Sequence, residues 1–336
     1  MSGCNNCIVY VFSWLSTYLV THSGTVHIDG LNSPQTIDSV EMASAARSIV
    51  RCVLPTKAGP IHRLVGSLDF KGQGTKHELA GLDPVVLCDY TGTMSGAGKP
   101  PFGLHPHYGM IAVTTVLEGC FMDRDNINPP DGHLNEAGGI YTVSAGRGGC
   151  HEEKTEGNHE AIQTIFKIPE DKKDLLPELV KVRSGDLPML EVGGGSVKVL
   201  IGRMGQLESP AKLKALPRVV MLIVKLVSGG RIDVPLDADL EHGFVFVISG
   251  KCRLGGGEGW CEAGKGVWLF GGGEGLEVEA GEEEVEMLVV AGKPLNEPWV
   301  KLLGNNGFII TSTEEEAEKV MEVVNNTGDQ FTYLKI

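Results

Sequence analysis

Short apolar runs broken by glycine and proline dominate the chain from about Ile49 onward. Each run holds roughly four to eight residues rich in valine, isoleucine and leucine, which is typical of strands bounded by turns. The clearest runs are RSIVRCVLP, PVVLCDY, MIAVTTVLEG, VVMLIVKLVSGG, FVFVISG, VWLFGGG and MLVVAG. This pattern predicts an all-β protein.

Two stretches fit a helix better than a strand. Residues 170–182, EDKKDLLPELVKV, are a short candidate. Residues 313–326 are the stronger candidate, because Thr313 is a suitable N-cap and three glutamates follow it in the first turn. We expect this second stretch to form a C-terminal helix.

The strand pattern occurs twice along the chain. Residues 110–125 resemble 244–256, and residues 138–153 resemble 264–280, each time as strand, glycine turn and strand. The repetition predicts two similar all-β units joined near residues 186–195. Antiparallel barrels are one way for such strands to avoid open edges.

We therefore divide the chain into three parts. Residues 1–45 lack a regular pattern and are interpreted as an N-terminal extension, disordered or not native, with Met42 as an alternative start. Residues 46–185 form the predicted N-terminal domain, and residues 190–336 the predicted C-terminal domain. A length of 336 residues agrees with about two domains.

Composition narrows the function classes. The formal net charge of −14 repels phosphate backbones and argues against direct nucleic-acid binding. Eight irregularly spaced cysteines indicate a reducing compartment, and the apolar runs are too short to span a bilayer. We expect a cytoplasmic or nuclear monomer. The glutamate-rich stretch 274–286 is interpreted as a solvated edge, with an acidic contact surface for a protein partner as the alternative.

The strongest chemical signal is a pair of histidines followed by a second pair of ligand residues. His105 and His107 flank Pro106, so on a strand both imidazoles lie on one side of the sheet. His151 and Glu153 repeat this spacing after the glycine turn AGRGG. The two pairs together predict a metal site.

Three imidazoles and one carboxylate suit a divalent first-row metal, and iron, manganese, nickel, copper and zinc remain open. Four protein ligands leave two octahedral positions for water, dioxygen or substrate. One anionic ligand would leave the site at net +1, which favours an anionic substrate. We expect Glu152 to point away from the metal, and His133 and His159 to lie on the surface.

The second unit has no comparable pair of ligands. Between Gly229 and Ala280 the only histidine is His242, and no H-x-H or H-x-E pair occurs. We therefore expect the C-terminal barrel to be structural and without metal.

At these residues the chain resembles the pirins, two-domain members of the cupin superfamily. The matching stretches are LDPVVLCDY, HPHYG, LEG, AGRGGCHEE, GKPLNEPWV and NGFIITSTEEEAEKV. The resemblance implies a bicupin of two antiparallel β-barrels of the double-stranded β-helix or RmlC-like jelly-roll type. It also implies one metal ion, Fe(II), held in the N-terminal barrel by His105, His107, His151 and Glu153.

The resemblance implies two functions. Pirins are described as quercetin 2,3-dioxygenases, which use a flavonol and O2, and as nuclear co-regulators that respond to iron redox state. In the first reading Glu153 is the catalytic base. In the second the protein is a non-catalytic interaction module, and a divergent pirin that binds metal for stability alone is a third reading. A cavity of ~300 Å³ beside the metal would favour the enzyme.

The chain departs from the family pattern around the expected metal. Tyr108, Ile111, Thr142 and Ile165 stand where pirins usually have arginine, glutamate, an aromatic residue and tryptophan. The ligands are retained but their surroundings are smaller or apolar. Because outer groups orient the ligands and tune the metal, we expect slow turnover of quercetin.

Overall fold

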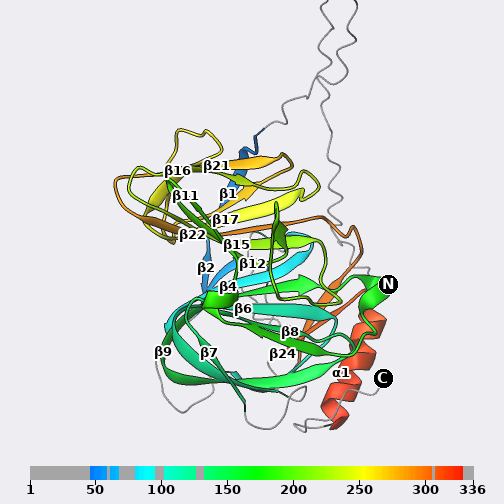
Figure 1. The fold of residues 1–336 in the computed structure, drawn as a ribbon. Coiled ribbons are helices and arrows are strands. Elements are labelled where there is room, and N and C mark those ends of the chain that lie inside the picture. The colour runs from blue at the N-terminus through cyan, green and yellow to red at the C-terminus, as the bar shows by residue number, and fades with distance from the viewer. Residues whose placement is uncertain are drawn as a thin grey trace, which may run out of the picture. The chain divides into compact units, whose positions relative to one another are not determined.

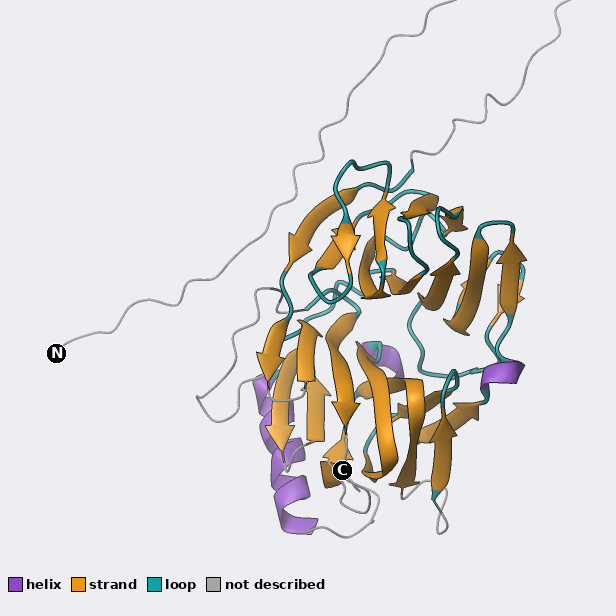
Figure 2. Cartoon of the chain, turned by 90° about the vertical axis from the view of Figure 1, so that its left-hand side faces the viewer, coloured by secondary structure: helices purple, strands orange, loops and turns teal. Residues whose placement is uncertain are grey.

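The computed structural model describes residues 46–58, 61–67, 79, 81–94, 102–125, 132–304 and 307–327. The described residues belong to one compact unit. Within the described residues the strands gather in two bodies (Figures 1 and 2). The predicted extension 1–45 lies outside the described residues.

The first body is a nine-stranded antiparallel sheet that curves into a barrel. Its main order is β10-β8-β6-β9-β4-β3-β2, with β5 added beside β9 and β7 beside β6. The strands are β2 (Thr56–Ala58), β3 (Ile61–Val65), β4 (Val85–Met94), β5 (Phe102–His107), β6 (Met110–Asp125), β7 (His133–Glu136), β8 (Ile140–Ser144), β9 (Gly149–Lys167) and β10 (Glu178–Val182).

The second body combines a seven-stranded and a four-stranded sheet, and the pairings of both are antiparallel. The seven strands, in sheet order, are β1 (Ile49–Val53), β20 (Val267–Phe270), β17 (His242–Ser249), β22 (Val285–Gly292), β15 (Val219–Leu226), β12 (Gly195–Ile201) and β11 (Met189–Val192). The four are β16 (Arg231–Pro235), β21 (Gly275–Ala280), β18 (Lys251–Leu254) and β19 (Cys261–Glu262), and a small ribbon pairs β13 (Arg203–Met204) with β14 (Leu207–Glu208).

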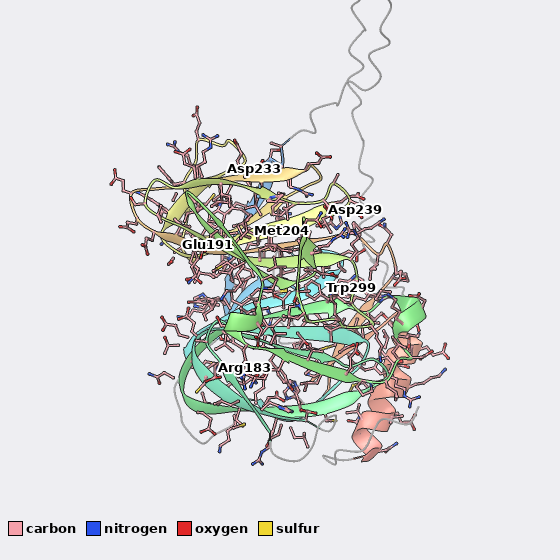
Figure 3. The ribbon with its side chains drawn as sticks, viewed as in Figure 1. Arg183, Glu191, Met204, Asp233, Asp239 and Trp299 are labelled. Carbon is pink, nitrogen blue, oxygen red and sulfur yellow. The ribbon has the colours of Figure 1, made fainter. Side chains whose placement is uncertain are left out.

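Alternation along the strands decides which side chains enter the core. On β16, Ile232 and Val234 are buried while Asp233 between them is exposed (Figure 3). One large cluster of buried side chains joins the two bodies, with Ile111 and Phe166 from the first and Phe244 and Leu288 from the second. The predicted all-β bicupin architecture is confirmed.

Each body also receives an element from the other half of the sequence. The N-terminal β1 pairs with β20, whereas β24 (Gly307–Thr311), which pairs with β23 (Val300–Gly304), contacts β5 of the first body. The helix α1 (Glu314–Thr327) packs on β24 and against Tyr108. The division into domains 46–185 and 190–336 stays a prediction. In this division β1 and β24 each contact the body formed mainly by the other half of the sequence.

The internal repetition appears in the strand pairing. β8 pairs with β6 in the first body, and β20 pairs with β17 at the equivalent position of the second. β9 and β22 then cover the other side of β6 and β17. The repeated strand–turn–strand pattern therefore corresponds to a repeated sheet topology.

Of the two predicted helices, only the C-terminal one forms. The Thr313 hydroxyl accepts a hydrogen bond from the Glu316 amide at 3.2 Å, as expected of an N-cap. The helix predicted over 170–182 is wrong, since Glu170–Lys172 make one 3-10 turn and Glu178–Val182 form β10. Pro177 removes a backbone donor, and ELVKV gains five cross-strand partners on β8. A second 3-10 turn occupies Ser184–Asp186, and no helix among the described residues is long and apolar enough to cross a membrane.

Arg47 anchors the start of the described chain in the second body. Its guanidinium donates to the carbonyl oxygens of Leu240 and Gly271 at 2.6 Å and of Asp237 at 2.8 Å. It also lies over the ring of Phe270, 5.4 Å from the ring centre. Arg47 is fully buried, and the Asp237 carbonyl oxygen also accepts from the Leu240 amide at 3.0 Å, so Arg47 matters most as the donor to the carbonyls of Leu240 and Gly271.

Replacing Arg47 with Met should lower the free energy of unfolding by about 2–4 kcal/mol. The substitution keeps an apolar stem but leaves buried carbonyl groups without a donor. Urea denaturation measures the change, and Arg51→Met is the control because Arg51 is exposed. Equal stability of the two variants would contradict the anchoring role.

A chain that begins at Met42 should melt within experimental error of the full-length protein, because it retains Arg47 and β1. A chain that begins at Pro55 should melt roughly 10 °C lower, because it loses Arg47 and exposes the edge of β20. Thermal unfolding followed by circular dichroism compares the three. A marked loss on removal of residues 1–41 would show that this segment stabilises the fold.

Candidate metal centre

The pairing of β5 with β9 brings the predicted ligand pairs together. In this register His105 lies opposite His151, and Pro106 lies opposite Cys150. β5 pairs with β9 on one side only, so Pro106 occupies a strand position that needs no second partner. The spacing H-x-H therefore places both imidazoles on the face from which His151 projects.

The three histidines form one buried cluster. The ring centres of His105, His107 and His151 lie 4.4–4.8 Å apart. The Nε2 atoms of His107 and His151 are separated by 2.9 Å, and one potential ligand atom from each ring lies within 4.8 Å of the others. The exposed fractions are 5%, 2% and 1%. This arrangement can hold a metal ion.

Glu153 lies beside this cluster. Its carboxylate forms a second group of potential ligands with His151 and Asp123, again within 4.8 Å, and the two groups share His151. Glu153 is buried, with an exposed fraction of 8%. The structure thus brings the three histidines together and places Glu153 next to one of them. Its role as the fourth ligand stays a prediction.

Two acidic residues of the site, Asp123 and Asp125, were missed in the sequence. Asp123 accepts a hydrogen bond from Nδ1 of His151 at 2.8 Å, and its other oxygen accepts one from the Tyr141 hydroxyl. Asp123 lies opposite Glu153 in the pairing of β6 with β9, and Asp125 lies opposite His151. The alternating acids of MDRD at the end of an apolar strand were the available signal.

Burial controls the protonation of the cluster. It lowers the pKa of His105 to about 3 and also lowers that of His107, so both are neutral imidazoles. Burial opposes the charging of His151 too, but the carboxylate of Asp123 outweighs it and raises the pKa to about 8. Burial raises the pKa of Glu153 to about 7, against the opposing effect of His151.

The C-terminal strand β24 directly contacts β5, the strand that carries His105 and His107. The Phe308 amide on β24 donates to Nδ1 of His107 at 3.2 Å, and Gly307 packs so closely on Pro106 that a Cβ would lie 1.7 Å from its carbonyl oxygen. Hydrogen bonds therefore connect Phe308, His107, His151 and Asp123 in series.

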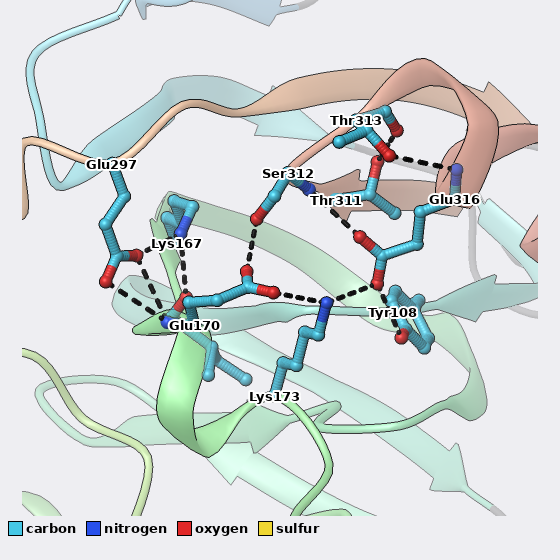
Figure 4. Close-up of polar contacts among 10 residues, drawn as sticks. Tyr108, Lys167, Glu170, Lys173, Glu297, Thr311, Ser312, Thr313 and Glu316 are labelled. Carbon is cyan, nitrogen blue, oxygen red and sulfur yellow. Dashed lines mark hydrogen bonds and ion pairs between the residues drawn. The ribbon is translucent and has the colours of Figure 1, made fainter.

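The residue after His107 is fixed by a polar network that reaches α1 (Figure 4). The Tyr108 hydroxyl donates to Glu316 at 3.1 Å, and Lys173 donates to the same carboxylate oxygen at 2.8 Å. Glu170 accepts from Lys173 and from Ser312. The network joins Tyr108, the residue that follows β5, to the C-terminal helix.

A small cavity of about 40 Å³ lies beside Glu153, and none of the three clustered histidines lines it. Its lining includes Glu153, His159, Phe121 and Gln163. The expectation that His159 lies on the surface is wrong: it is buried, and its ring packs 5.7 Å from that of Phe121. Glu152 does point away, since it is partly exposed and pairs with Arg124 at 3.7 Å.

More carboxylates lie around the cluster than the one counted from the sequence. That count included Glu153 alone, but Asp123 and Asp125 are also buried here. His133 lies 3.5 Å from Asp125 and is partly exposed. Because these additional carboxylates surround the histidines, a bound divalent ion would not leave the site at net +1, and the preference for an anionic substrate is no longer supported.

Comparison with known proteins places the chain among two-domain cupins. The family model described as Pirin matches residues 68–167, and the model of the Pirin C-terminal cupin domain matches residues 221–327. Pirin-1 of Arabidopsis thaliana is 26% identical over 289 residues, which cover 82% of this chain and 96% of that protein.

Solved structures share the fold. The structure of a quercetin 2,3-dioxygenase from Acinetobacter baumannii matches with a TM-score of 0.71 and 21% identity, covering 85% of this chain and 99% of that one. A bacterial pirin from Escherichia coli, solved in complex with nickel(II), matches with a TM-score of 0.54 and 18% identity over 72% of this chain and 96% of that one.

The two family matches, in the expected order along one bicupin fold, agree with the HPH and H-x-E residues that the structure brings to one barrel. The chain belongs to the pirin family, as a distant member.

Proposed function

We propose that the N-terminal barrel holds one divalent metal ion, with Fe(II) as the first candidate, on His105, His107, His151 and Glu153. We further propose that the protein is a quercetin 2,3-dioxygenase-type oxidoreductase that acts on a flavonol with O2. The buried cluster of three imidazoles carries the first part of the proposal. The names of structurally similar proteins support the second.

The residues present fit a metal ion. Two nitrogens about 2.1 Å from one ion and at right angles to each other lie about 3 Å apart, close to the 2.9 Å between the Nε2 atoms of His107 and His151. Burial keeps His105 and His107 neutral, as ligands must be. The neighbouring buried carboxylates would also be stabilised by a cation. Nickel in the related bacterial pirin supports a first-row metal without fixing which one.

The chain's own residues would then have separate roles in binding the metal and in moving a proton. A bound divalent metal supplies Lewis acidity and a route for electrons between substrate and dioxygen. His105, His107 and His151 orient the site from two rigid strands. The carboxylate of Glu153, which also lines the cavity, is placed to take the proton of a substrate hydroxyl. Phe121 and His159 line the same cavity.

A second candidate function is a non-catalytic, redox-responsive interaction module. The size of the cavity beside Glu153 favours it: about 40 Å³ is well below the ~300 Å³ of an ordinary small-molecule pocket. A flavonol would need side chains around the cavity to move. The two candidates share the metal centre and differ in whether substrate enters.

Purified protein should contain one metal ion per chain, and His107→Ala should reduce the occupancy by at least tenfold. The substitution removes the imidazole that faces His151. Elemental analysis by mass spectrometry gives the stoichiometry. His62→Ala is the matched control, because His62 lies on β3, outside both ligand groups. Equal loss in both variants would argue against this centre.

Glu153→Gln should slow flavonol consumption by about 10²-fold at equal metal content, because it removes a base while keeping the side chain's size. Quercetin absorbance and oxygen uptake measure turnover, and Glu152→Gln is the control. Metal content is determined on the same samples, since weaker binding would also lower activity. If metal-loaded wild type consumes no flavonol, the dioxygenase proposal fails and the interaction module takes its place.

A further inference from the structure

Asp123 is a completely buried carboxylate with both oxygens engaged. One oxygen accepts from Nδ1 of His151 at 2.8 Å, and the other accepts from the Tyr141 hydroxyl. Asp123 comes from β6, a strand that contributes none of the predicted ligands. The histidine that Asp123 contacts is His151, which both ligand groups share.

The hydrogen bond from His151 decides which ring nitrogen faces the other histidines. A carboxylate accepts hydrogen bonds, so in the neutral imidazole the proton resides on Nδ1 and the lone pair on Nε2. That Nε2 is the atom lying 2.9 Å from Nε2 of His107. Without an acceptor at Nδ1, the ring could rotate or change tautomer and offer no lone pair to the cluster.

Tyr141 in turn restrains Asp123. It lies on β8, is buried, and has its ring nearly parallel to that of His151, at 9° with centres 6.5 Å apart. Its hydroxyl holds the oxygen of Asp123 that His151 does not use. Strands β6, β8 and β9 thus each supply one member of a buried Tyr–Asp–His chain.

We propose that Asp123 is a positioning residue of the metal centre, which fixes the tautomer and orientation of His151, and that Tyr141 holds Asp123 in place. This inference rests on the proposed metal site. Both oxygens of Asp123 are already occupied, whereas Glu153 has no side-chain hydrogen bond among the described residues. Asp123 therefore acts through His151, and Glu153 is the carboxylate left for the ion.

Metal titration tests the proposal with Co(II), whose visible spectrum reports the ligand set. Asp123→Leu removes the acceptor and should weaken Co(II) binding by about 10- to 100-fold, the usual scale for an outer partner of a ligand. Asp123→Asn keeps an acceptor oxygen and should lose only a few-fold, with a wild-type spectrum. Tyr141→Phe should fall between wild type and Asp123→Leu. Glu152→Gln removes a carboxylate next to His151 that points away, and should bind as wild type does.

A metal-free measurement separates this inference from the proposed function. Nitrogen-15 NMR of labelled histidine, recorded at a pH where the spectrum itself shows His151 to be neutral, should show the Nδ1–H tautomer in wild type and Asp123→Asn, and its loss in Asp123→Leu. If wild type binds no Co(II), the metal proposal fails while the tautomer result still decides the role of Asp123.

Three results would overturn the inference. One is Co(II) affinity in Asp123→Leu equal to that of wild type, in protein whose circular dichroism shows it folded. Another is an unchanged His151 tautomer in that variant. The last is a d–d spectrum in Asp123→Asn that indicates loss of a ligand, since this would make Asp123 a ligand itself.

Discussion

The antiparallel pairing of β6 with β9 is the interaction on which the first barrel depends. The two strands run side by side from Met110–Lys167 at one end to Asp125–His151 at the other. At the first end they bury Ile111 and Phe166 in the core shared with the second body. At the other end they bring Asp123 beside His151. One ladder therefore fixes the geometry of the site relative to a rigid apolar core.

The ladder is irregular in its middle, and this irregularity separates its two ends. The register shifts between Val116 and Glu118 and again between Gly119 and Phe121. Gly119 has a φ of 71°, and a Cβ there would lie 1.9 Å from the Asn158 carbonyl oxygen. Only glycine tolerates both conditions. Because of the resulting bend, one half of β6 contributes side chains to the apolar core and the other half contributes side chains to the polar cluster.

Burying the polar cluster is costly, and the surrounding contacts compensate for it. Asp123, His151 and Tyr141 satisfy one another, while Phe308 satisfies His107 from the opposite side. The C-terminal segment thus contributes to the first barrel's site. Glu316 of α1 accepts a hydrogen bond from Tyr108, the residue that follows β5. Both halves of the chain therefore hold β5 in place. Together with the shared apolar core, this arrangement joins the two bodies into one compact unit.

The sequence alone determined the fold class, the repeated strand unit, the helix from Glu314 and the two pairs of candidate ligands, His105 with His107 and His151 with Glu153. These follow from local periodicity and from i, i+2 spacing, which need no knowledge of distant partners. The tertiary structure decided the rest. β10 became a strand because β8 supplied its partners, and His159 became buried because β9 passes beside Phe121. Asp123 joined the site because a register between strands far apart in sequence set it beside His151. The position of Arg47 in the second body was likewise decided by long-range pairing, which leaves no local pattern in the chain.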